Sequence, residues 1–137
     1  MRISRRSFAH ACLALLIALS GAMPAAATDP QTGDAAAGER VFRKCGTCHT
    51  ATSPDNRVGP SLQGVVGRPV ARVSTYSYSA AMTAFGADGK TWDAARLSAY
   101  LIAPRAMVPG TRMSFAGLKS DKDIADVIAY LRTTAAP

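Results

Sequence analysis

The chain has 137 residues, with 16 lysines and arginines against 9 aspartates and glutamates, and a formal net charge of +7. Hydrophobic residues make up 48% of the chain, and no internal repeat is visible. This size predicts one small domain, which excludes a multi-domain protein. The basic residues form no continuous tract and are not interleaved with aromatic residues, which excludes a nucleic-acid partner.

Residues 1–27 have the three parts of a secretory signal peptide: a basic start, an apolar run at 11–19 and small residues up to Ala27. The apolar run is shorter than the ~20 residues that a membrane-spanning helix needs, so we expect no integral membrane anchor. We predict cleavage near Ala27, a single domain of residues 28–137, and a periplasmic location. The pair Arg5-Arg6 is compatible with either general or twin-arginine export.

The net positive charge outside the leader is modest. Without Arg2, Arg5 and Arg6 the chain keeps 13 basic residues against 9 acidic ones, a balance of +4. Such a balance suits brief encounters with acidic partner surfaces, where charge speeds association more than it raises affinity.

The first element after the leader is a helix predicted over residues 35–42, with Asp34 as its N-cap. It leads into Cys45-Gly46-Thr47-Cys48-His49. On a helical turn, positions i, i+3 and i+4 share one face, so both thiols and the imidazole point the same way. A Cys-x-x-Cys-His run is the attachment signature of c-type haem. The two thiols bond to the porphyrin while the imidazole reaches the iron.

A Cys-x-x-Cys pair also occurs in thioredoxin-like dithiols and in zinc sites. Once Cys12 and His10 are lost with the leader, the only remaining thiols and imidazole are Cys45, Cys48 and His49. A structural zinc ion needs about four ligands, and a redox dithiol needs a strand-to-helix setting that the sequence does not show. We therefore predict one covalent haem c, with His49 as an iron ligand.

The rest of the chain alternates between loops and helices. Residues 50–77 show no sustained periodicity, and a loop of this length is usually functional or wrapped around a ligand. We predict a short helix at 79–85 and a longer one at 92–102, capped by Thr91 and followed by Pro104.

The last helix has the clearest pattern in the chain. Ser120 and Asp123 form a capping box. Apolar residues then recur at i, i+3, i+4 and i+7, at Ile124, Val127, Ile128 and Leu131. The predicted fold class is all-α: three main helices, short helices, and long loops around one haem.

With no second histidine outside the leader, the other face of the iron is either open or bound by methionine or lysine. Met82 and Met107 lie in or beside short helices, where packing explains them. Met113 lies in the turn-forming segment 109–117 between two predicted helices. This segment can cross the opposite haem face.

Several short motifs follow one another along residues 28–137. They are Gly38, Phe42, the Cys45–His49 run, Val58-Gly59-Pro60-Ser61-Leu62, Gly64, Gly67-Arg68, Tyr76-Ser77-Tyr78-Ser79, Thr91-Trp92, Tyr100-Leu101, Pro104, Pro109-Gly110-Thr111-Arg112-Met113, Phe115, Gly117 and Ile128-Ala129-Tyr130-Leu131. In this order and spacing they resemble the class I cytochromes c, of the mitochondrial-like bacterial kind. The resemblance implies that Met113 is the second axial ligand.

The resemblance also implies roles around the haem. The carbonyl of Pro60 accepts a hydrogen bond from His49 and orients its ring. Arg68, Tyr78 and Trp92 lie near the haem propionates. Tyr100 and Thr111 are hydrogen-bonding neighbours of Met113. Contacts between the first and last helices are implied for Gly38, Phe42, Tyr130 and Leu131.

A haem held by His49 and Met113 leaves no position for a substrate, so we predict a monomeric one-electron carrier and not an enzyme. It would shuttle electrons from a cytochrome bc-type donor to an oxidase, reaction centre or reductase, in respiratory or photosynthetic complexes. Docking would be transient and electrostatic. The basic residues expected at its rim are Arg43, Lys44, Arg57, Arg105, Arg112 and Lys119.

Two alternatives remain at this stage. One is a five-coordinate haem protein that acts as a peroxidase or gas sensor. The other is a dedicated electron-accepting subunit of a periplasmic dehydrogenase.

Overall fold

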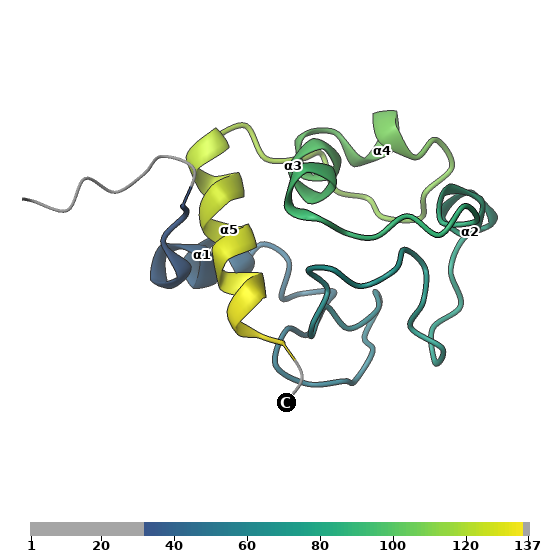
Figure 1. Cartoon of the computed structure of the whole chain (residues 1–137), viewed down its shortest axis with the longest axis horizontal. Coiled ribbons are helices and arrows are strands. Elements are labelled where there is room, and N and C mark those ends of the chain that lie inside the picture. The colour runs from purple at the N-terminus through teal and green to yellow at the C-terminus, as the bar shows by residue number, and fades with distance from the viewer. Residues whose placement is uncertain (1–31, 136–137) are drawn as a thin grey trace, which may run out of the picture.

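A computed structural model describes residues 32–135, so the predicted signal peptide, residues 1–27, lies outside the described residues. The described residues form five helices and no strand (Figure 1), and the predicted all-α class is confirmed. The only ladder-type pairing in them is an isolated bridge between Pro69 and Thr91. The helices are α1 (Ala35–Phe42), α2 (Ala80–Phe85), α3 (Ala94–Ile102), α4 (Pro104–Met107) and α5 (Asp121–Thr133).

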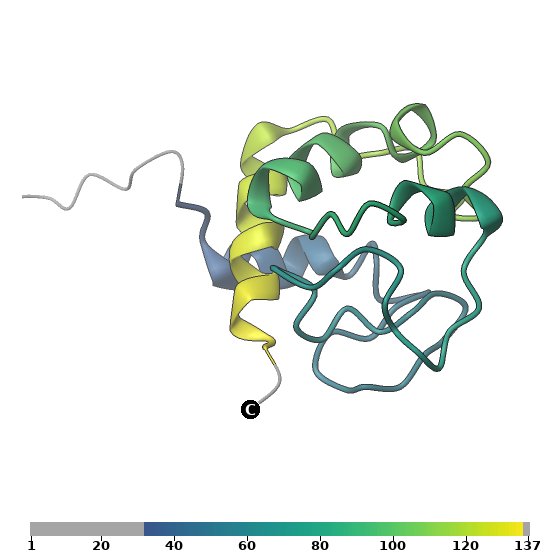
Figure 2. The same cartoon turned by 45° about the vertical axis from the view of Figure 1, so that its right-hand side comes forward.

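The first and last helices cross each other in direct contact at one end of the molecule (Figures 1 and 2). Gly38 is the buried residue of α1, and a Cβ built on it would lie 1.9 Å from the carbonyl oxygen of Asp126 on α5. Next to this crossing, the rings of Phe42 and Tyr130 have their centroids 5.3 Å apart. The predicted contact between first and last helices is therefore confirmed, and a glycine is what allows the close approach.

A buried carboxylate reinforces the same crossing. Asp126 is 3% exposed. It accepts hydrogen bonds from the backbone N–H of Asp34 at 2.8 Å and from the ammonium of Lys122 at 2.6 Å. Burial acts to raise the pKa of Asp126, but these hydrogen bonds and the charges of Lys122 and Arg40 outweigh it and hold the pKa below its usual value.

We expect Asp126→Asn to lower the free energy of unfolding by about 1–3 kcal/mol at pH 7, because the charged hydrogen bonds are lost. A carboxyl with a depressed folded-state pKa stabilises fully above its unfolded pKa of about 3.9, and this contribution is lost as pH falls through the folded pKa. The difference from the unchanged protein should therefore shrink below about pH 4. Urea unfolding of the two haem-loaded proteins, at pH 7 and again below about pH 4, measures this difference in stability. An equal difference at both would contradict it, and exposed Asp121→Asn is the control.

The boundaries of α3 correct one prediction. Its N-cap is Asp93, whose side chain accepts from the N–H of Arg96 at 2.7 Å, and Thr91 does not cap it. The N–H of Trp92 donates instead to the carbonyl of Arg68, so the chain is still paired with the preceding loop at that point. Only after that pairing ends does the helix begin.

Pro104 follows α3, as predicted, and also opens the unpredicted four-residue helix α4. Proline suits the first helical position because its missing N–H would have no partner there. The predicted caps Asp34 and Ser120 match the structure, and Ser79, which was predicted to be the first residue of a helix at 79–85, is instead the N-cap of α2. Asp34, Ser79 and Ser120 each accept a hydrogen bond from the first turn of α1, α2 and α5.

The middle of the molecule has two layers (Figure 2). Loops between α1 and α2 form one layer, and α2, α3 and α4 lie over it. The loops contain only turns, bends and the isolated bridge, as predicted for residues 50–77. Within residues 32–135, no helix is both long enough and apolar enough to cross a bilayer.

Candidate functional site

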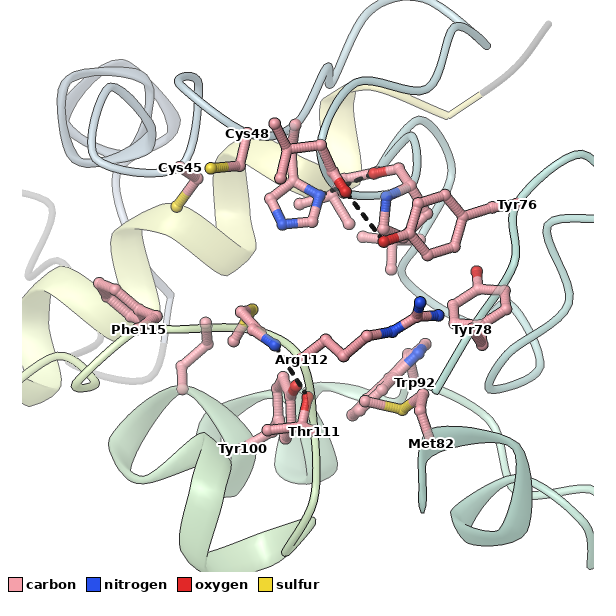
Figure 3. Close-up of a pocket in the computed structure, with 18 of the residues that line it drawn as sticks. Cys45, Cys48, Tyr76, Tyr78, Met82, Trp92, Tyr100, Thr111, Arg112 and Phe115 are labelled. Carbon is pink, nitrogen blue, oxygen red and sulfur yellow. Dashed lines mark hydrogen bonds between the residues drawn. The ribbon is translucent and has the colours of Figure 1, made fainter. Parts of the chain in front are cut away.

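A cavity of about 610 Å³ lies between the two layers (Figure 3). In the close-up, Cys45 and Cys48 lie on one side, with Trp92, Tyr100 and Thr111 on the opposite side. Every residue that the sequence analysis assigned to haem binding lines this one cavity: Cys45, Cys48, His49, Pro60, Arg68, Tyr78, Trp92, Tyr100, Thr111 and Met113. The fold thus gathers residues that are spread over most of the described chain.

The Cys45–His49 run forms a helical turn after α1. The N–H of Cys45 donates to the carbonyl of Phe42 at 2.7 Å, and the N–H of His49 donates to that of Cys45 at 2.9 Å. Both sulfurs therefore lie on the cavity side, as Figure 3 shows for Cys45 and Cys48. Burial raises the pKa of the Cys45 thiol, although the charge of Lys44 opposes the shift, so this sulfur is uncharged at neutral pH.

The imidazole of His49 is fixed by a contact of 2.7 Å between its Nδ1 and the carbonyl oxygen of Pro60. Burial lowers the pKa of His49, and the hydrogen bond to Pro60 opposes that shift, so the ring is neutral at neutral pH. A neutral ring carries one N–H, which Nδ1 donates to Pro60. The lone pair of Nε2 is then free to bind a metal ion.

Gly59 leaves room for this imidazole. A Cβ built on Gly59 would lie 2.2 Å from Cε1 of His49 and 2.7 Å from its Nδ1. No real Cβ occupies such a position, so any side chain at residue 59 displaces the ring.

We expect Gly59→Ala to lower the yield of haem-loaded protein several-fold. The displaced imidazole of His49 loses its hydrogen bond to Pro60 and its orientation toward the cavity. Gly46→Ala is the matched control, since a Cβ there has ordinary contacts of 3.7 Å or more. Haem absorbance per milligram of purified protein measures the effect. Equal haem content in the two variants would contradict the expectation.

The opposite side of the cavity carries the segment before Met113. The side chain of Thr111 lies beside the hydroxyl of Tyr100 and opposes the rise that burial causes in the pKa of Tyr100. The N–H of Met113 donates to the Thr111 hydroxyl at 3.3 Å. Thr111 and Arg112 lie across the cavity from Cys45 and Cys48 (Figure 3). The residue next in the chain, Met113, also lines the cavity.

Polar groups line one end of the cavity. Burial raises the pKa of Tyr78, whose hydroxyl oxygen accepts from the N–H of Val73 at 3.4 Å. The guanidinium of Arg68 donates to the carbonyls of Gln63 and Ser61 at 2.9 and 2.8 Å. Burial lowers the pKa of Arg68, and the neighbouring Tyr78 opposes that shift. These hydrogen bonds fix the guanidinium beside the cavity and leave part of its N–H set for a further acceptor.

Sequence reasoning missed several lining residues. Tyr76, Met82 and Phe115 line the cavity, although Met82 was assigned to packing and the other two had no assigned role. Their signal was weak, because apolar and aromatic residues are equally common in ordinary cores. Among the basic residues expected at the rim, Lys44 and Arg112 line the cavity, whereas Arg43, Arg57, Arg105 and Lys119 do not.

These features fit a covalently bound haem. The cavity volume falls within the range of ~300–1,000 Å³ that is usual for cofactor sites. Its lining is mostly apolar, including Leu62, Val65, Leu97, Leu101 and Leu131. Among the residues that the structure describes, neither Cys45 nor Cys48 has a disulfide partner, so both sulfurs are available to the vinyl groups of a porphyrin.

Comparison with known proteins agrees with this fit. The profile of the cytochrome c family matches residues 35–135. A cytochrome c2 from Afifella marina is 45% identical over 105 residues, which cover 75% of this chain and 85% of that protein. The cytochrome c-type cyt cy of Rhodobacter capsulatus is 50% identical over 103 residues, covering 74% of this chain but only 50% of that longer protein.

A solved structure extends the match to the fold. Cytochrome cH from Methylobacterium extorquens superposes with a TM-score of 0.67 and is 44% identical, over 74% of this chain and 99% of its own. Family profile, relatives and fold agree with the cavity and its Cys-x-x-Cys-His turn. The chain belongs to the cytochrome c family of electron-carrying haem proteins, with haem c attached through Cys45 and Cys48.

Proposed function

We propose that the protein is a periplasmic one-electron carrier whose haem iron is held between His49 and Met113. One observation carries the proposal. Both of these residues line the cavity that also contains the two cysteines, and the segment leading to Met113 lies across it from Cys45 and Cys48 (Figure 3). The haem supplies an iron that gains and loses a single electron.

The two axial residues favour electron transfer over other haem chemistry. A thioether ligand raises the reduction potential, and filling both axial positions leaves no site for oxygen, peroxide or another small ligand. The apolar cavity adds to this by keeping water from the iron and by disfavouring the more highly charged oxidised form. His49 contributes a fixed ring, since Pro60 holds its Nδ1 at 2.7 Å.

The remaining cavity residues would hold and orient the group. Tyr100 and Thr111 would support the segment before Met113, since the Thr111 hydroxyl accepts from the N–H of Met113 and lies beside the hydroxyl of Tyr100. Arg68, Tyr78 and Trp92 would donate hydrogen bonds to the haem propionates and offset the cost of burying their charge. Arg68 suits that task best, because two of its N–H groups are already anchored to the carbonyls of Ser61 and Gln63.

We further infer that residues 1–27 direct export and are removed near Ala27, and that the carrier, residues 28–137, acts as a monomer. Its donor would be a cytochrome bc-type membrane complex, and its acceptor an oxidase, reaction centre or reductase. Encounters would be brief and electrostatic, as small redox interfaces are. Lys44 and Arg112, which line the cavity, would be the basic residues that such a partner meets.

The absorption spectrum of the oxidised protein tests the axial pair. We expect a low-spin ferric spectrum with a methionine–iron charge-transfer band in the near infrared. A high-spin spectrum without that band would support a five-coordinate peroxidase or gas sensor and overturn the proposal. Purification at low and high salt tests the other alternative, because a stable stoichiometric complex with a dehydrogenase would indicate a dedicated subunit.

A further inference from the structure

The segment that carries Met113 has little backbone support. Of the N–H groups in residues 112–117, all of which the structure describes, only that of Met113 donates a hydrogen bond, to the hydroxyl of Thr111 at 3.3 Å. The segment has no helical structure, and Leu118 is the next residue with a backbone hydrogen bond, to Leu101. Segments with so few backbone hydrogen bonds open at low cost, so side chains must determine how well this one stays closed.

One side chain supplies a link across the cavity. The guanidinium of Arg112 donates to the carbonyl oxygen of Ser77, which is 35 residues away in the sequence. In Figure 3 the Arg112 side chain extends from the side of Thr111 and Tyr100 toward Tyr78. It therefore joins the Met113 segment to the loop on the other side of the cavity.

The loop that receives this bond is itself anchored. The hydroxyl of Tyr76 donates to the carbonyl of Val58 at 2.9 Å, and the amide of Asn56 donates to the hydroxyl of Thr75, also at 2.9 Å. Asn56 and Val58 lie just before Pro60 in the chain, and the carbonyl of Pro60 orients His49. The Arg112 bond thus connects the side of the cavity that carries Met113 to the side that carries His49.

We propose that Arg112 is a positioning residue that holds Met113 against the iron by bonding to Ser77. The inference rests on the proposed ligation by Met113. Arginine suits the role because its planar guanidinium offers several donors in fixed directions and keeps its charge at any physiological pH. Because this bond is absent when the segment swings out, it stabilises the closed, ligated state and disfavours the open one.

Binding of free imidazole to the oxidised, haem-loaded protein measures this opening, because imidazole reaches the iron only when Met113 leaves it. We expect Arg112→Gln to bind imidazole about tenfold more tightly than the unchanged protein, which corresponds to the loss of one charged hydrogen bond. Arg112→Lys should fall between the two, since lysine keeps the charge and one donor but loses the planar guanidinium. Arg132→Gln is the matched control. Arg132 is exposed in the last turn of α5, and its substitution removes the same charge.

The outcomes separate this inference from the proposal on which it rests. If the unchanged protein shows the methionine–iron band and Arg112→Gln binds imidazole no more tightly, the positioning role is wrong. If Arg132→Gln tightens binding as much as Arg112→Gln does, net charge explains the effect and the role is again wrong. If the unchanged protein lacks the band altogether, the ligation by Met113 fails instead.

Discussion

Replacing Met113 with leucine should lower the reduction potential of the haem by about 0.2 V, a substantial part of the ~0.8 V range that axial ligands control. Leucine has nearly the same volume as methionine, so the cavity keeps its packing. It has no sulfur lone pair, so the iron loses the ligand that stabilises its reduced form. A redox titration of the purified protein, followed by its visible absorption, measures the change.

Met82→Leu is the control for this experiment. Met82 lines the same cavity and is 9% exposed, so the substitution removes a second thioether from similar surroundings. We expect the reduction potential of Met82→Leu to stay close to that of the unchanged protein, because Met82 is not the proposed ligand. Its backbone is held in α2, where its N–H donates to the capping hydroxyl of Ser79. If Met82→Leu lowers the potential and Met113→Leu does not, the assignment of the axial ligand is wrong.

Gly38→Ala should destabilise the folded protein by about 3 kcal/mol or more. The new Cβ would lie 1.9 Å from the carbonyl oxygen of Asp126 and 2.8 Å from the Cβ of Tyr130. The first of these contacts is with backbone, so the substitution is relieved only if α1 and α5 move apart. The gain of ~1 kcal/mol that alanine brings to a helix interior is too small to compensate.

Urea unfolding of the haem-loaded protein measures this loss. Glu39→Ala is a suitable control, because Glu39 is the exposed neighbour of Gly38 in the same helix and should change stability by less than about 0.5 kcal/mol. Since Leu131 of α5 lines the cavity, separation of the helices should also weaken haem packing. Equal stability of the two variants would show that the helices do not approach as closely as described.

Local signals in the sequence were sufficient to predict α1, α2 and α5. Asp34, Ser79 and Ser120 are ordinary capping residues, and α5 has an apolar period that needs no knowledge of its partner. The start of α3 was misplaced because Trp92 is held by a backbone hydrogen bond to Arg68, a contact that no local pattern encodes. The four-residue helix α4 was missed because it is too short to show a period.

The cavity likewise has some features that the local sequence predicts and others that only the fold reveals. The Cys45–His49 turn could be predicted from spacing alone, since one helical turn places all three side chains. The bond from Arg112 to Ser77 joins residues 35 positions apart, and only the folded chain reveals it. The need for glycine at residue 59 likewise depends on where the His49 ring lies. Features built from contacts between distant loops therefore required the structure.

The most direct test of the axial pair is an NMR spectrum of the reduced protein with its methionine methyl groups labelled with ¹³C. A methyl group held against the haem face experiences the ring current of the porphyrin. We predict one methionine resonance shifted far upfield, present in Met82→Leu and absent in Met113→Leu. A spectrum with no shifted methionine, or one whose shifted signal disappears in Met82→Leu, would contradict the ligation by His49 and Met113.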